Sequence, residues 1–180
     1  MRPKIVLQAC DEFLKNGYHG TSLSDIALKY ILSKATIYHY FPSKAALFET
    51  VMEFLMKQWG NAVVAAVGED SLGERNLLSV RDSVLVVMDQ SKIISIERLA
   101  IGEAARFPRI SNMYDKCVFI PLVEALTTLI LNNNRRVPIT HSAAREKSRK
   151  LAALFLSSRH RSLLNVEPVN GLCTLIEGFG

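Results

Sequence analysis

Apolar residues recur at helical spacing along almost the whole chain. Segments with apolar positions at i, i+3, i+4 and i+7 follow one another, and no stretch alternates between apolar and polar residues as a half-buried strand does. We therefore expect an all-α protein. The helices that this pattern predicts cover residues 3–16, two short segments that start at residues 22 and 34, and residues 44–67, 77–90, 92–106, 112–131, 140–164 and 171–178.

Capping residues mark the ends of the first helices. Gly17 follows the first helix and can adopt the positive φ of a C-terminal cap. Ser22, three residues before an Asp, resembles the start of a capping box, and Ser33 is a suitable N-cap for residues 34–40. Pro42 disfavours helix at the residue before it and so ends that segment. These signals predict two unusually short helices joined by a tight turn.

Two short helices joined by a turn of about four residues are typical of the helix-turn-helix, whose second helix enters the major groove of DNA. We accordingly predict an N-terminal three-helix head, joined by a long helix to a larger helical body. We expect the head, residues 1–46, to be the DNA-binding domain, and the body covers residues 47–180.

The second short helix carries the residue types that a recognition helix needs. Leu32, Ile37 and Phe41 are spaced to face inward, which leaves the polar side chains on the outer face. The residues that we expect at the DNA are Ser22, Ser33, Lys34, Ala35, Thr36, Tyr38, His39, Tyr40 and Lys44. Lys34, Thr36 and His39 suit base edges. Tyr hydroxyls and the helix starts at Ser22 and Lys44 suit phosphates.

The stretch "GYHGTSLSDIALKYILSKATIYHYFPSKAALFETV", residues 17–51, resembles the DNA-binding head of the tetracycline-repressor (TetR) family. The matching motifs are Gly-Tyr, Thr-Ser, Ile-Ala, Ser-Lys, Thr-Ile-Tyr, Tyr-Phe and a Lys that opens the next helix. A second, shorter resemblance, to the C-terminal domain of one branch of that family, lies in "GEAARFPRISNMY", residues 102–114. The resemblance implies a homodimeric repressor that a small-molecule effector releases from a palindromic operator. It also implies that residues 47–180 form the ligand-binding and dimerisation domain.

The turn departs from the family pattern. Ile31 stands where the family usually has Gly, and Lys29 and Tyr30 stand where small residues are usual. Gly is favoured there because such turns often need a positive φ, which is costly for a β-branched residue. We expect either a reshaped turn or strain at Ile31.

The body has helices that are apolar on two sides. Two stripes run along residues 116–131, and a third apolar face lies on the helix of residues 140–164. The first two stripes are Val118, Leu122, Ala125 and Leu129, and Phe119, Val123, Leu126 and Ile130; the third contains Leu151, Leu154, Phe155 and Ser158. A helix that is apolar on two sides needs two partners, its own core and a second surface. This pattern favours a homodimer, and the alternative is that these helices are central in a monomer.

Composition narrows the function further. The net charge of +5 over 180 residues permits a polyanionic partner without requiring one. No apolar run is long enough to cross a membrane, and the N-terminus lacks the pattern of a signal peptide, so we expect a cytoplasmic protein. The three cysteines, far apart, indicate neither a disulfide framework nor a metal site.

An enzyme is the less favoured class. His39 near Thr36, Cys117 and His160 are reactive residue types, but no phosphate-binding loop, HExxH or GxSxG motif accompanies them. We predict no catalytic residue, no cofactor and no metal. A helical protein-interaction adaptor with a degenerate DNA-binding head is the alternative to a regulator, because residues 29–31 depart from the family pattern.

Overall fold

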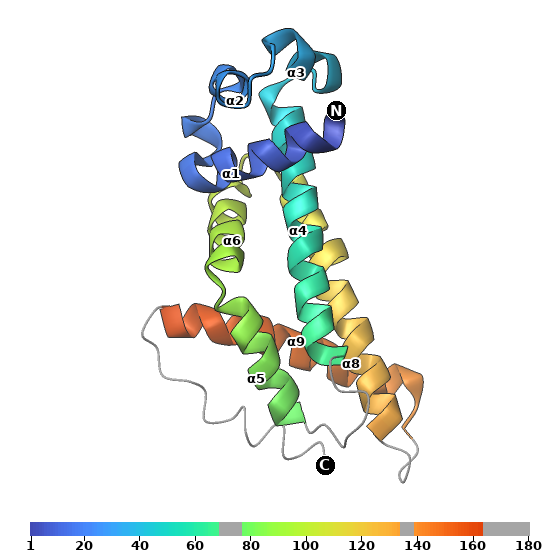
Figure 1. Ribbon diagram of the computed structural model, residues 1–180. Coiled ribbons are helices and arrows are strands. Elements are labelled where there is room, and N and C mark those ends of the chain that lie inside the picture. The colour runs from blue at the N-terminus through green and yellow to red at the C-terminus, as the bar shows by residue number, and fades with distance from the viewer. Residues whose placement is uncertain (69–76, 134–138, 164–180) are drawn as a thin grey trace. The chain divides into compact units, whose positions relative to one another are not determined.

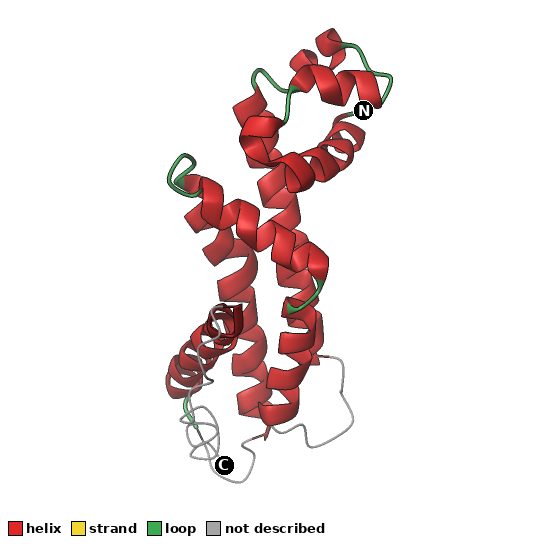
Figure 2. Cartoon of the chain, turned by 90° about the vertical axis from the view of Figure 1, so that its left-hand side faces the viewer, coloured by secondary structure: helices red, strands yellow, loops and turns green. Residues whose placement is uncertain are grey.

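A computed structural model describes residues 1–68, 77–133 and 139–163 of the chain, with side chains up to residue 157 in the last segment. Within those residues every regular element is a helix (Figure 2), which confirms the all-α prediction. The predicted helix of residues 171–178 lies outside the described residues.

The helices lie close to where the sequence predicts them. The α-helices are α1 Arg2–Gly20, α2 Leu23–Lys29, α3 Lys34–Tyr40, α4 Lys44–Gly68, α5 Leu77–Met88, α6 Ser91–Glu103, α7 Arg109–Tyr114, α8 Ile120–Asn133 and α9 His141–Leu163. The predicted helix 112–131 is replaced by α7, a π-helical segment η1 (Asp115–Phe119) and α8. Pro121 has no amide hydrogen for the carbonyl four residues earlier, which agrees with an irregular turn just before it.

The chain folds into two compact units, each made of two separate stretches of sequence. One contains Met1–Trp59 and Ser91–Cys117, and the other contains the described parts of Gly60–Gln90 and Val118–Gly180. The division of the chain into functional domains between residues 46 and 47 stays a prediction.

The first unit is built around an aromatic cluster of Phe13, Tyr18, Phe48 and Phe107. Ring centroids lie 5.0 Å apart for Phe13 and Phe48, 4.8 Å for Tyr18 and Phe107, and 4.8 Å for Phe48 and Phe107. Such distances fall in the range of favourable aromatic pairs. The cluster therefore joins α1, the start of α4 and the segment between α6 and α7 (Figure 1).

In the second unit α8 and α5 pack against α9 (Figure 1). Leu122 and Leu126 of α8 and Leu151 and Phe155 of α9 are fully buried. Burial of this size stabilises by roughly 1.5–3 kcal/mol for each large apolar side chain. Residues from both predicted stripes of α8 thus contribute to the core of this unit.

Candidate nucleic-acid interface

The first helix of the pair, α2, begins at the predicted cap. The Ser22 hydroxyl accepts a hydrogen bond from the Asp25 amide at 3.0 Å. Leu23, Ile26 and Ala27 are buried, as their spacing predicts. A capped helix of only seven residues keeps its position because this apolar edge packs on the rest of the head.

The turn between α2 and α3 is a Schellman motif with Ile31 at its left-handed position. The Leu32 amide donates to the Ala27 carbonyl at 2.8 Å, and the Ile31 amide donates to the Leu28 carbonyl at 3.4 Å. Ile31 has a φ of 54° and is the only non-glycine residue with positive φ in the described chain. Its side chain is 95% exposed, so no packing compensates for the strain. Of the two predicted outcomes, a reshaped turn or strain at Ile31, the positive φ agrees with the second.

Helix α3 turns an apolar edge inward and a polar face outward. Ser33 caps it by accepting from the Thr36 amide at 2.9 Å, and Ile37 and Phe41 are buried. Lys34, Ala35, Tyr38, His39 and Tyr40 are exposed, and Thr36 is partly exposed. The structure therefore brings the predicted contact residues of α3 onto one accessible element.

Lys44, at the start of α4, has a role inside the head that its sequence position did not show. Its ammonium donates to the carbonyls of Tyr18 at 2.8 Å and Thr21 at 2.9 Å, and it lies 4.3 Å from the centre of the Tyr18 ring. The Nζ atom is thus occupied by partners within the chain. The amides of the first turn of α4, which precede the helical hydrogen-bond ladder, are better placed to receive a phosphate.

Lys29 also has a structural partner. Its ammonium pairs with the carboxylate of Glu12, a side chain that is almost completely buried in α1. Glu12 also accepts from the Asn16 amide group at 3.2 Å. The Glu12 hydrogen bond raises the pKa of Lys29. This ion pair ties α2 to α1 and explains a Lys where the family usually has a small residue.

Sequence reasoning missed one cation beside the recognition helix. The guanidinium of Arg2 lies 5.4 Å from the centre of the Phe41 ring, at the junction of α3 and α4. Arg2 is exposed and begins α1. Only the folding of α1 against this junction places a cation there, so the local sequence carries no signal for it.

Nothing in the described residues assembles a reaction centre around the reactive residue types. Burial raises the pKa of the Cys117 thiol, which disfavours the thiolate that a nucleophile needs. The ring of His39 makes an edge contact with Tyr40 at 4.9 Å on the exposed face of α3. No group of three or more potential metal-binding side chains comes together in the described part of the chain. The His160 side chain lies outside the described residues.

The arrangement is that of a helix-turn-helix DNA-binding domain, and a comparison with known families identifies its kind. Residues 5–51 match the family "Bacterial regulatory proteins, tetR family". Residues 5–51 are therefore similar to the DNA-binding domain of that family, and the predicted resemblance of residues 17–51 is confirmed.

Known relatives are transcription regulators. The negative transcriptional regulator IcaR of the biofilm operon icaADBC of Staphylococcus aureus is 33% identical over 64 residues, which are 36% of this chain and 34% of that protein. The transcriptional regulator RutR of Escherichia coli is 40% identical over 55 residues, 31% of this chain and 26% of RutR. The chain thus spans about a third or less of the length of these relatives. Their class agrees with the prediction of a regulator rather than an enzyme.

The likeness in fold extends further than the likeness in sequence. A crystal structure from Mesorhizobium loti, assigned to the TetR family of transcriptional regulators, superposes with a TM-score of 0.76. That match covers 99% of this chain and 94% of the other at 20% identity. The fold of the chain is therefore that of TetR-family structures. None of its described helices is long and apolar enough to cross a membrane.

Proposed function

We propose that this protein is a cytoplasmic homodimeric repressor that reads a palindromic operator with α3 and is released from it by a small molecule. The observation that carries the proposal is the exposed polar face of α3, held by buried Ile37 and Phe41 in a TetR-family head. A helix of this kind fits the major groove, which is about 12 Å wide.

Different side chains of α3 contact the bases and the phosphates of the DNA. Lys34 donates to guanine, Thr36 contacts a base edge or a thymine methyl group, and His39 donates to a base acceptor. The hydroxyls of Tyr38 and Tyr40 contact phosphates, together with the starts of α2 and α4. Specificity then resides in Lys34, Thr36 and His39, and general affinity in the phosphate contacts.

Partly exposed apolar side chains in the second unit support the homodimer. Ile120 is 44% exposed, and Ala125 and Leu129 of α8 and Leu154 of α9 are only partly covered within the chain. Ala125, Leu129 and Leu154 belong to the predicted stripes, and Ile120 adds a further exposed apolar side chain on α8. A second copy would bury them and would set the spacing of the two recognition helices.

Selection of bound fragments from a random DNA pool, followed by titration at several salt concentrations, tests the proposal. We expect a palindromic consensus, and an affinity that falls with salt as phosphate contacts release counterions. Lys34→Ala should weaken operator binding by about tenfold, and Thr36→Ala should relax preference at one base pair, because a good base contact contributes roughly 1–3 kcal/mol. Lys116→Ala, an exposed lysine outside the head, is the matched control.

One observation favours the alternative of a protein-interaction adaptor. Leu28 is 83% exposed and Ile31 is 95% exposed, so the tip of the head carries two large apolar side chains. The same titration separates the two functions. Weak binding that is equal for every sequence would refute the repressor and favour the adaptor.

A further inference from the structure

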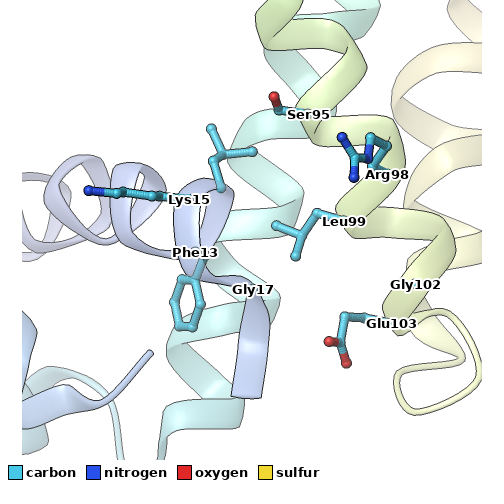
Figure 3. Close-up of a pocket in the computed structure, with 9 residues that line it drawn as sticks. Phe13, Lys15, Gly17, Ser95, Arg98, Leu99, Gly102 and Glu103 are labelled. Carbon is cyan, nitrogen blue, oxygen red and sulfur yellow. The ribbon is translucent and has the colours of Figure 1, made fainter. Parts of the chain in front are cut away.

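A cavity lies between α1 and α6, inside the first compact unit, and has a volume of about 360 Å³. Phe13 and Leu14 line it from α1, and Leu99 extends from α6 toward α1 (Figure 3). Ser95 and Arg98 lie at one end of the α6 side and Glu103 at the other. The volume falls in the range of small-molecule sites, roughly 300–1,000 Å³.

The charges around the cavity favour an anion. The Glu103 carboxylate is engaged by the Arg106 guanidinium, from the turn that follows α6, at 3.7 Å. Arg98 has no ion-pair partner among the described residues, and neither has Lys15. The Lys15 side chain is directed away from α6 (Figure 3), so Arg98 is the cation available to a molecule in the cavity. A guanidinium binds a carboxylate or sulfonate through two parallel hydrogen bonds.

Two glycines keep the cavity open. A Cβ atom at Gly102 would meet no atom within 4 Å, and the same is true at Gly17. Gly102 stands near the C-terminal end of α6 and has no positive φ, so larger residues are sterically and conformationally allowed there. A larger side chain at position 102 would extend into this space without disturbing the backbone.

We propose that this cavity binds a small amphipathic anion, an aryl or alkyl group that ends in a carboxylate or sulfonate. The apolar part packs on Leu14 and Leu99, and the anionic group pairs with Arg98 beside Ser95. The site is separate from the DNA-facing surface of α3.

Occupation of the cavity acts on the head through α1. Phe13 and Gly17 line the cavity, and the adjoining residue Tyr18 provides one of the two carbonyls that hold the Lys44 ammonium. A molecule that spreads α1 from α6 therefore shifts the segment that connects to α2 and α4. This regulatory role rests on the proposed function, whereas the binding site does not.

Calorimetric titration of the full chain with 2-naphthoate, a bicyclic aryl carboxylate, tests the site without DNA. We expect a Kd below about 1 mM for the wild-type chain. Arg98→Ala should weaken binding by about tenfold, and the neutral analogue 2-naphthalenemethanol should lose a similar factor, because each removes one charge-assisted contact. Lys15→Ala should change the Kd by less than about threefold, as expected of an exposed charge directed away from the site.

Gly102→Leu fills the cavity and should remove binding, while its far-ultraviolet circular dichroism remains that of the wild type. Gly68→Leu and Arg149→Ala make the same exchanges at exposed helical positions that do not line the cavity, and both should bind as the wild type does. No binding to the wild-type chain, or binding that is unchanged in both Arg98→Ala and Gly102→Leu, would overturn the site.

The same variants test the regulatory role. Saturating 2-naphthoate should weaken operator binding by the wild-type chain and leave operator binding by Gly102→Leu unchanged. A chain that binds 2-naphthoate but no DNA would support the proposed binding site and refute the proposed repressor function. An operator affinity that is insensitive to bound 2-naphthoate would overturn the regulatory role alone.

Discussion

Replacing Ile31 by glycine should stabilise the protein, although Ile31 belongs to the recognition motif. The left-handed conformation costs a non-glycine residue about 1–2 kcal/mol, and glycine adopts it freely. Glycine also adds conformational freedom to the unfolded chain, which costs about 0.4–1 kcal/mol. Because the Ile31 side chain is 95% exposed, no packing is lost. The net gain is about 0.5–1 kcal/mol, or a rise in Tm of about 1–4 °C for a chain of this size.

Urea denaturation at a fixed protein concentration, followed by circular dichroism and by fluorescence of Trp59, measures the effect in the unit that contains the turn. Ile31→Ala is the decisive control, because it removes the exposed apolar side chain but keeps the Cβ atom that the left-handed region disfavours. A third variant, Ile31→Asn, carries a residue that tolerates the left-handed region better than Ala does. We expect Ile31→Gly to be more stable than Ile31→Asn, and Ile31→Asn to be more stable than Ile31→Ala. If Gly and Ala shift the midpoint equally, the strain at Ile31 is not the cause and the reasoning is wrong.

Three further changes probe the head and its core. Gly17→Ala should destabilise by about 1–3 kcal/mol in urea denaturation, because a φ of 71° with a ψ of −179° is open to little but glycine; Gly68→Ala, at a helical position without positive φ, should not. Lys29→Ala should lower the urea midpoint by leaving the buried Glu12 carboxylate without its ammonium, and a Glu12→Gln background should remove most of that loss; equal losses in both backgrounds would contradict it. Burial raises the pKa of Cys10 from 9.0 to about 12, so the unfolded thiol ionises first and the free energy of unfolding should fall above pH 9. The slope for this group is at most about 1.4 kcal/mol per pH unit. In Cys10→Ala the decline between pH 9 and 10.5 should be shallower, and an identical decline would show that Cys10 is not its source.

Local signals predicted the local structure well. Ser22 and Ser33 cap their helices, Gly17 adopts a positive φ, and Ile31 adopts the left-handed conformation that glycine usually takes in such a turn. Each of these depends on a few neighbouring residues, whose preferences are independent of the rest of the fold.

Contacts between distant residues could not be predicted in this way. Lys44 and its carbonyl partner Tyr18 are 26 positions apart, and Lys29 and Glu12 are 17 positions apart. A lysine at the start of a helix has the same sequence pattern whether its ammonium faces solvent or caps a carbonyl. Only the packing of α1 across α2 and α4 decides between these roles, and it also places Arg2 beside Phe41.

Because of the aromatic cluster, residues 1–46 cannot be exchanged between regulators without loss of packing contacts. Phe13 and Tyr18 belong to the first helix, yet their ring partners Phe48 and Phe107 lie beyond residue 46. A chimera that received only residues 1–46 would contain Phe13 and Tyr18 without the Phe48 and Phe107 rings that they contact. A substitution of Phe107 would therefore also remove a ring contact of Tyr18 in the first helix. A chimera that preserves these ring contacts would have to exchange residues 1–59 and 91–117 together, because these two stretches form one compact unit.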